Sequence, residues 1–88
     1  LARQVGREAH RWLGFVRFRE VSGGLYYAAM APDHRVLPLI ARHFAARFRD
    51  QQWVIHDLRH GEGLVHDRLR RRWLLLPMER HGEPARTW

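Results

Sequence analysis

Two glycine-containing turns constrain the fold of this chain more than any other feature of its sequence. "SGG" at 22–24 and "GEG" at 61–63 each lie between apolar runs that are short enough to be strands. This pattern is typical of β-hairpins, because glycine supplies the backbone conformations that tight turns require. We therefore expect one hairpin over 15–31, a second hairpin over 53–67, and a final strand over 71–76.

Two other segments have the periodicity of amphipathic helices. Apolar residues recur every three to four positions within about 2–13 and again within about 37–49, which places them on one helix face. Pro38 fits the first turn of the second helix, where its missing N–H needs no partner. Together these elements predict an α+β fold, in which a mainly antiparallel sheet of four to five strands packs against two helices.

Length and composition allow a single domain of this kind. The chain has 88 residues, of which 45% are hydrophobic, and no cysteine, so a core must form without disulfides. We expect one domain over 1–76 that is a segment of a longer chain, and a polar linker or disordered tail over 77–88. Because no run is apolar enough to span a membrane and no signal-peptide pattern is present, we expect a cytoplasmic protein.

The charge of the chain favours an anionic partner. Sixteen basic residues outnumber nine acidic ones, which gives a net charge of +7, and all sixteen are arginine. A positive field attracts polyanions such as nucleic acids over long distances. Arginine also binds phosphate through two N–H groups and stacks on bases. A GC-rich coding sequence would replace lysine by arginine as well, so the net charge is the stronger argument.

Arginine and aromatic residues alternate in the first predicted hairpin. Its first strand would carry Phe15, Arg17 and Arg19 on one face. A two-residue turn adds Tyr26 to that face and a three-residue loop adds Tyr27 instead, and the sequence leaves both registers open. Such a platform would offer a guanidinium group to phosphate and a ring to a base. An ordinary solvated strand face is the other interpretation.

A second group of arginines is contiguous in the sequence. Four of the five residues from 68 to 72 are arginine, namely Arg68, Arg70, Arg71 and Arg72, and Trp73 follows them. Like charges at this density repel one another unless an anion is bound, which favours a binding site. A solvated loop is again the alternative.

Signatures of catalysis and metal binding are weak. The turn glycines do not form a phosphate-binding loop, and the only serine, Ser22, lies in a turn. Among seven histidines, His56 and His60 would lie about 13 Å apart along a strand, too far to share a metal ion. We expect no cofactor, no metal and no catalytic residue in this segment. An enzyme built around His43 and Asp57 is a third alternative, although a partly buried aspartate there would more simply pair with an arginine.

Two stretches of the chain resemble a known family. "GREAHRWLGFVRF" at 6–18 and "GLYYAAMAPDHRVLPLIARHFAARFRDQQWVIHD" at 24–57 are similar to a bacterial domain of unknown function that is assigned to DNA repair or DNA metabolism. The resemblance extends over about 3–58 and is loose after residue 60. It implies a domain that occurs alone beside a radical-SAM protein, or fused in front of a uracil-DNA-glycosylase-like domain. Either protein is therefore an expected partner.

The family pattern includes polar positions that a hydrophobic core does not require. They are matched here above all by His10, Arg11, Arg17, His43 and Arg47, and the pattern also includes His34 and Asp57. His43 and Arg47 lie one turn apart on the second predicted helix, so we expect them to meet the first helix and the hairpin near one edge of the domain. A buried polar network that fixes the helices is the alternative to a functional pocket.

These observations predict an accessory, nucleic-acid-associated domain of a DNA repair or DNA modification system, whose chemistry comes from a fused or partner enzyme. It would contact mainly the phosphates of DNA. The expected DNA-binding residues are Arg11, Arg17, Arg19, Arg47, Arg70, Arg71 and Arg72, and a polar pocket would comprise His10, His43 and Asp57. The main alternative is a protein-interaction module that docks the glycosylase-like or radical-SAM partner through an exposed apolar patch around Tyr26, Tyr27 and Trp73.

Overall fold

A computed structural model describes residues 2–80 and shows a two-layer arrangement of helices and strands. Its helices are α1 (Ala2–Phe15) and α2 (Leu37–Arg47), and its strands are β1 (Arg19–Ser22), β2 (Leu25–Met30), β3 (Gln52–Asp57), β4 (Glu62–Asp67) and β5 (Arg72–Pro77). The predicted α+β fold is confirmed. Neither helix within the described residues is long and apolar enough to span a membrane.

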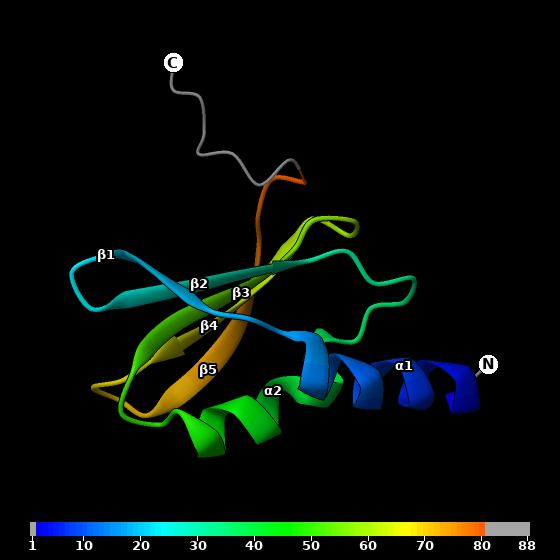
Figure 1. The fold of residues 1–88 in the computed structure, drawn as a ribbon, viewed down its shortest axis with the longest axis horizontal. Coiled ribbons are helices and arrows are strands. Elements are labelled where there is room, and N and C mark those ends of the chain that lie inside the picture. Colours follow the sequence, from blue (N-terminus) through cyan, green and yellow to red (C-terminus); the bar gives the residue numbers. More distant parts are fainter. Residues whose placement is uncertain (1, 81–88) are drawn as a thin grey trace.

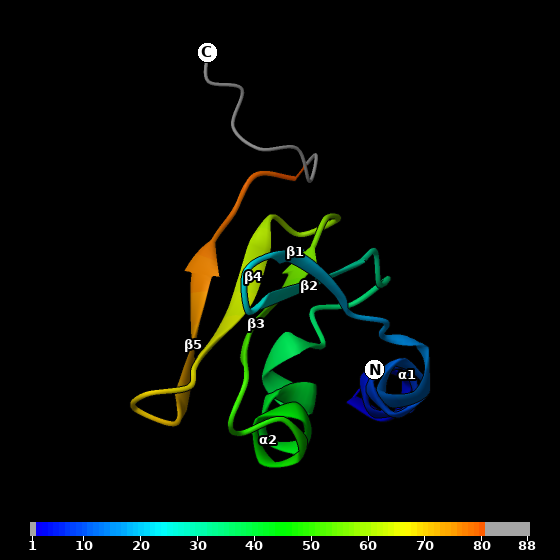
Figure 2. The same ribbon diagram turned by 60° about the vertical axis from the view of Figure 1, so that its left-hand side comes forward.

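The strands form one sheet in chain order, β1-β2-β3-β4-β5. Neighbouring strands are antiparallel except β2 and β3, which are parallel because α2 connects them as a crossover. Both helices lie on the same side of the sheet (Figure 1), and the view in Figure 2 separates α1 from α2 along that side. Among residues 2–80, no helix lies on the opposite side of the sheet.

The hydrophobic core lies between α2 and the middle of the sheet. Leu37, Ile40 and Ala41 of α2 are fully buried, as are Trp53 and Ile55 of β3. Burying an aliphatic side chain of this size contributes about 1.5–3 kcal/mol to folding. Helix α2 contacts α1 as well as β4 and β5, so it connects α1 to the sheet.

The first hairpin begins later than predicted, because α1 does not end at Gly14. The N–H of Val16 donates to the carbonyl of Trp12 over 3.1 Å, which continues the helical bonding past the glycine. The rings of Trp12 and Phe15 also meet edge to face at 5.8 Å, which holds Phe15 on the helix. Residues 16–18 then cross to the sheet, and β1 starts only at Arg19.

The register of this hairpin combines both predicted alternatives. Ser22 pairs with Leu25, so the turn has two residues, but the register shifts between Glu20 and Ser22. This irregularity is a β-bulge, which adds one residue to a strand and moves the following pairs by one position. Arg19 consequently lies opposite Tyr27, as the three-residue loop would have placed it.

The predicted tail over 77–88 is described only in part. Pro77 belongs to β5, and Met78 lies so close to Gly63 that a Cβ atom on the glycine would stand 1.9 Å from the methionine sulfur. The carbonyl of Glu79 accepts a hydrogen bond from His56 Nε2 over 2.5 Å. Residues 81–88, which make up the rest of that prediction, lie outside the described residues.

Candidate nucleic-acid interface

A groove with basic walls separates α1 from α2. Its volume is about 690 Å³, its polar lining residues are His10, Arg11, Arg17, His43 and Arg47, and no acidic side chain of the described residues lines it. Leu13, Val16, Phe18, Phe44 and Phe48 form the apolar part of the lining. We refer to it as the α1–α2 groove.

Three separate segments bring these basic side chains together. His10 and Arg11 come from the last half of α1, and His43 and Arg47 lie one turn apart on the facing side of α2. Arg17 comes from the crossing segment 16–18. The structure therefore gathers the five polar residues that the family pattern singled out above all, although they lie up to 37 positions apart in the sequence.

Two of the arginines are held in fixed positions. Arg17 Nη1 donates to the carbonyl oxygens of Gly14 at 2.7 Å and Val16 at 3.0 Å, which places its guanidinium group at the end of α1. The guanidinium carbon of Arg47 lies 5.4 Å from the centre of the Phe48 ring. Both groups are thus positioned before any ligand binds, which lowers the entropic cost of binding.

No acidic residue neutralises the arginines of this groove. The five ion pairs within residues 2–80 involve His34, His60, Arg59, Arg70 and Arg71. None of them includes Arg11, Arg17 or Arg47. These exposed positive charges face one another across a concave surface, which focuses the field and raises the local concentration of anions.

The predicted platform of Phe15, Arg17 and Arg19 on one strand face is wrong. Phe15 belongs to α1 and Arg17 to the crossing segment, so strand alternation never applies to them. Arg19 is in β1, with its guanidinium carbon 6.0 Å from the Tyr27 ring centre. It does not line the α1–α2 groove.

The contiguous arginines lie on the other flank of α2. Arg71 and Arg72 line a second groove of about 420 Å³, together with Arg42, Arg49 and Trp73. We refer to it as the α2–β5 groove. Neither Arg42 nor Arg49 was predicted to be a site residue. Their seven-residue spacing, which is two helical turns, was the signal that could have placed them on one side of the second predicted helix.

Two of the contiguous arginines are already paired with carboxylates. Arg71 lies 3.4 Å from the Asp50 carboxylate, and Arg70 lies 3.0 Å from that of Asp67. Hydrogen bonds from the Arg70 side chain and backbone lower the pKa of Asp67, so this carboxylate stays charged. Two of the four contiguous arginines are therefore partly neutralised, whereas no ion pair within residues 2–80 includes an arginine of the α1–α2 groove.

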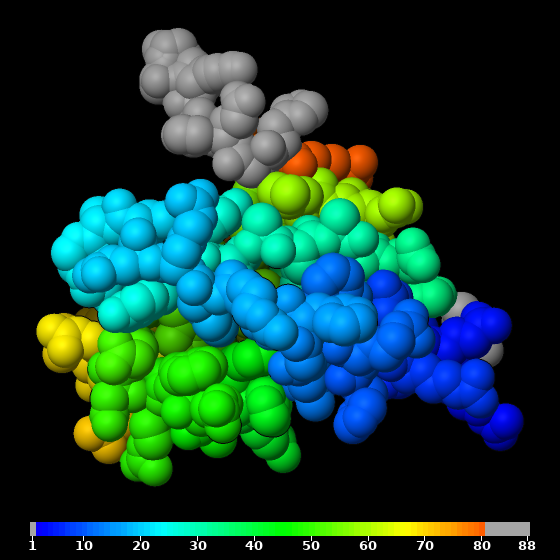
Figure 3. Space-filling view, in the orientation of Figure 1, coloured from blue at the N-terminus to red at the C-terminus, as the bar shows by residue number. Residues whose placement is uncertain are grey.

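Helix α2 forms a wall of both grooves. Its surface is green in Figure 3, where it lies between the blue surface of α1 and the yellow turn that joins β4 to β5. His43 and Arg47 face α1, whereas Arg42 and Arg49 face β5. Basic side chains therefore lie on both flanks of the helix.

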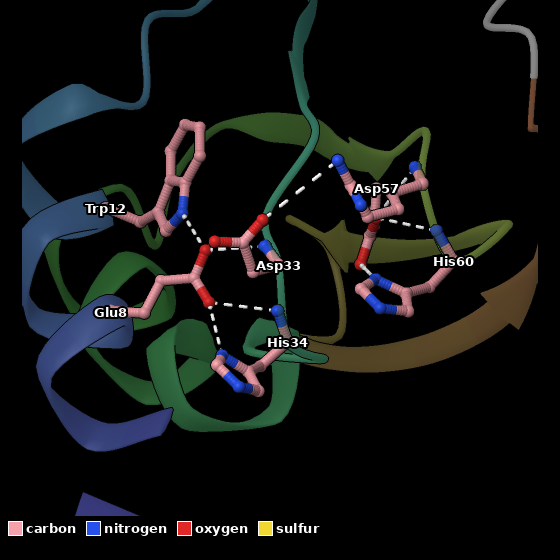
Figure 4. Close-up of polar contacts among 7 residues, drawn as sticks. Glu8, Trp12, Asp33, His34, Asp57 and His60 are labelled. Carbon is pink, nitrogen blue, oxygen red and sulfur yellow. Dashed lines mark hydrogen bonds and ion pairs between the residues drawn. The ribbon is translucent and has the colours of Figure 1, made fainter. Parts of the chain in front are cut away.

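A buried carboxylate keeps α1 in place beside α2. Glu8 is 5% exposed and accepts hydrogen bonds from the N–H groups of Asp33 and His34 and from the side chains of His34 and Trp12, as Figure 4 shows. Burial alone would raise its pKa, but these four hydrogen bonds lower it to about 2. Glu8 thus fixes the first wall of the α1–α2 groove through the loop that precedes α2.

Asp57 does not belong to a pocket with His10 and His43. It is fully buried at the end of β3, accepts hydrogen bonds from the N–H groups of Arg59 and His60, and pairs with His60 Nδ1 at 2.8 Å (Figure 4). The predicted pairing with an arginine is also wrong. The turn after β3 presents its own N–H groups to the carboxylate, and a local bond of this kind needs no distant partner.

Other histidines also have partners in the fold. His56 lies between the Tyr27 hydroxyl at 2.8 Å and the Glu79 carbonyl, and His66 Nδ1 contacts the Gln51 carbonyl at 2.9 Å. Within residues 2–80 no three histidine or acidic side chains come together in an arrangement that could hold a metal ion. The arrangement of these histidines therefore indicates structural roles.

The comparison with known families agrees with the resemblance at the level of the domain. A family model for a domain of unknown function, DUF4130, matches residues 1–88. The chain belongs to this family. No curated protein and no solved structure matches it. In this DUF4130 domain, the two grooves and their charges are the features that bear on function.

Proposed function

We propose that this domain binds nucleic acid through the phosphate backbone, as an accessory part of a DNA repair or DNA modification system. The observation that carries the proposal is the α1–α2 groove, where Arg11, Arg17 and Arg47 converge with two histidines and with no carboxylate from residues 2–80. Arginine presents a planar fork of N–H groups that matches phosphate oxygens. The chemistry of the system would come from a fused or separate enzyme, such as a uracil-DNA-glycosylase-like domain or a radical-SAM protein.

The shape of the basic surface supports contacts along a strand rather than with one isolated phosphate. The two grooves lie on either side of α2, with Arg47 in the lining of one and Arg42 and Arg49 in the lining of the other. A nucleic acid that crosses α2 would displace condensed counterions at each contacted phosphate. Its affinity would then fall as the salt concentration rises. Each contacted phosphate would add about 0.7–0.9 to the steepness of the plot of log affinity against log salt concentration.

The test is fluorescence anisotropy of labelled single- and double-stranded DNA over a series of salt concentrations. We expect Arg17→Ala combined with Arg47→Ala to weaken binding about tenfold at low salt and to reduce the slope by about 1.4–1.8. Arg35→Ala is the control, because this exposed arginine lines neither groove. Absence of binding by the unmodified domain at low salt would overturn the proposal.

The second candidate function, docking of a protein partner, is favoured by β5. This strand lies at the edge of the sheet, and Trp73, Leu74, Leu75 and Leu76 are between 36% and 43% exposed. An apolar edge strand with free backbone groups is a template for pairing with a strand of another chain. The half-buried Tyr26 and Tyr27 belong to the other half of the sheet, so the expected patch reduces to Trp73 and its neighbours.

Docking is tested by size-exclusion chromatography of the domain with a glycosylase-like or a radical-SAM protein. Leu75→Pro removes a backbone N–H that points away from β4, because the N–H of Met78 bonds to Gly61 and alternate residues of β5 face β4. It would therefore abolish a complex formed through the free edge. Leu39→Ala, at an exposed site on α2, is the control. A complex that survives Leu75→Pro in a folded domain would exclude this mode of docking.

A further inference from the structure

A small aromatic pocket opens beside the α1–α2 groove. Its volume is about 310 Å³, and it is lined by Phe18, Tyr26, Phe48, Gln51 and Trp53. Phe18 and Phe48 also line the α1–α2 groove, so the two cavities share a wall. A ligand could therefore reach the pocket from the basic groove without leaving the surface.

The aromatic walls of this pocket are fixed by the core. Trp53 is 1% exposed, donates through Nε1 to the Phe48 carbonyl over 3.1 Å, and stacks on His66 with ring centres 5.0 Å apart. Phe18 meets Phe48 and Trp53 at 5.6 and 5.7 Å between ring centres. The pocket is thus formed before a ligand binds, which is the usual condition of small-molecule sites.

Two polar groups in the pocket lack a hydrogen-bond partner among residues 2–80. The backbone of Gln51 is held by Phe48 and by His66, but its side-chain amide takes part in no hydrogen bond there. The Tyr26 hydroxyl likewise has no partner within the described residues, whereas the hydroxyl of its neighbour Tyr27 bonds to His56. An amide and a hydroxyl can both donate and accept, as the edge of a nucleobase requires.

We propose that this pocket takes one unstacked nucleobase of a strand whose phosphates lie in the α1–α2 groove. The inference rests on the proposed function and adds its ligand class: nucleic acid with an accessible base, either single-stranded or locally unpaired. A volume of about 310 Å³ is at the lower end of ligand sites, about 300–1,000 Å³, and suits a single ring system. Sequence-tolerant stacking on aromatic side chains is the usual way in which proteins bind unpaired bases.

The arrangement of charge supports this occupant over an apolar peptide. Arg17 and Arg47 stand in the groove that shares the Phe18–Phe48 wall, and no carboxylate lines either cavity. A nucleotide has an aromatic ring attached to a phosphate, so it satisfies both cavities at once. A peptide side chain would fill the pocket and leave the adjacent arginines without a partner.

The experiment compares two oligonucleotides of equal length and charge, an oligothymidylate and the same backbone with abasic residues. Anisotropy at fixed low salt should show that the unmodified domain binds the base-bearing strand at least tenfold more tightly. Gln51→Ala and Tyr26→Phe should each reduce that ratio and leave the affinity for the abasic strand unchanged. Both changes keep the aromatic packing, because Gln51 is exposed and phenylalanine retains the ring of Tyr26.

Matched controls and outcomes separate this inference from the proposed function. Gln4→Ala, at an exposed site on α1, and Tyr27→Phe, next to the pocket residue but not in its lining, should leave the ratio unchanged. Equal binding of both strands would overturn the nucleobase pocket and leave phosphate binding intact. Failure of both strands to bind at low salt would overturn the proposed function together with the pocket.

Discussion

The two arginine groups of this domain differ in how they are assembled. The arginines from 68 to 72 follow one another in a turn, and two of them are paired with Asp67 and Asp50. The arginines of the α1–α2 groove come from three segments, and none is in an ion pair within the described residues. The group that is conspicuous in the sequence is therefore the more nearly neutralised one in the structure.

This difference shows that charge density along a sequence is a poor measure of charge available to a ligand. Acidic residues in the same turn or in a facing element compensate a contiguous group, as Asp67 and Asp50 do. Exposed pairs of this kind contribute little to stability, because water and salt screen them. They nevertheless reduce the local positive potential, so they act mainly on ligand binding.

The largest effect should come from removing the carboxylate that holds α1 in place. Glu8 has a folded pKa of about 2 against an ordinary value of 4.5, so its contribution is complete above about pH 4.5 and is lost as the pH falls toward 2. The linkage corresponds to about 3 kcal/mol. We expect Glu8→Gln to lower the free energy of unfolding by a similar amount at pH 7, and to flatten its dependence on pH below 4.5.

Urea denaturation of both proteins between pH 2 and 7 measures this effect. The α1–α2 groove should be lost with the position of α1, whereas the α2–β5 groove does not include α1. Glu20→Gln is the matched control, since this carboxylate is exposed and accepts one hydrogen bond, from the N–H of Gly24. A stability profile of Glu8→Gln with the pH dependence of the unmodified domain would contradict the assignment.

A smaller effect is expected from a direct comparison of the two arginine groups. Replacing Arg70 and Arg71 with alanine removes the same charge as replacing Arg17 and Arg47. Because the first pair already has carboxylate partners, we expect it to weaken DNA binding about threefold or less, against about tenfold for the second pair. Anisotropy at one low salt concentration suffices, and equal losses would contradict the ranking of the two arginine groups.

The smallest effect should come from releasing the paired arginines. Asp50→Asn and Asp67→Asn leave Arg71 and Arg70 without their carboxylates, so each should raise DNA affinity about twofold to threefold at low salt. Asp33→Asn makes the same change in charge beside Arg59, which lines neither groove. An equal gain from Asp33→Asn would mean that net charge alone decides the affinity.

The sequence was sufficient to predict most elements of the fold. Glycine turns and apolar periodicity predicted both helices and all five strands, because these signals act between residues close in the chain. It could not show that α1 continues past Gly14 or that the strand bulges at Val21, since both depend on packing against the rest of the domain. A glycine stops a helix only when the following residues gain nothing by continuing it.

The candidate site was predictable only as a set of residues. Family-matched positions indicated His10, Arg11, Arg17, His43 and Arg47, and these line one groove. The same pattern included Asp57, but its carboxylate accepts hydrogen bonds from the N–H groups of the turn after β3 and lies outside the groove. The aromatic pocket was not predicted at all, because Phe18, Phe48 and Trp53 have the spacing of ordinary core residues and only the fold leaves a cavity between them.

The single parallel pair of strands has a consequence for the order of folding. Strands β3, β4 and β5 are joined by short turns, so they can pair at a low entropic cost of loop closure. The pairing of β2 with β3 must wait until the chain from 31 to 51, including α2, has closed a much longer loop. Pulsed hydrogen exchange should therefore show that the amides of β3, β4 and β5 are protected before the pairing of β2 with β3. Both grooves should form only after α2 has packed against the sheet.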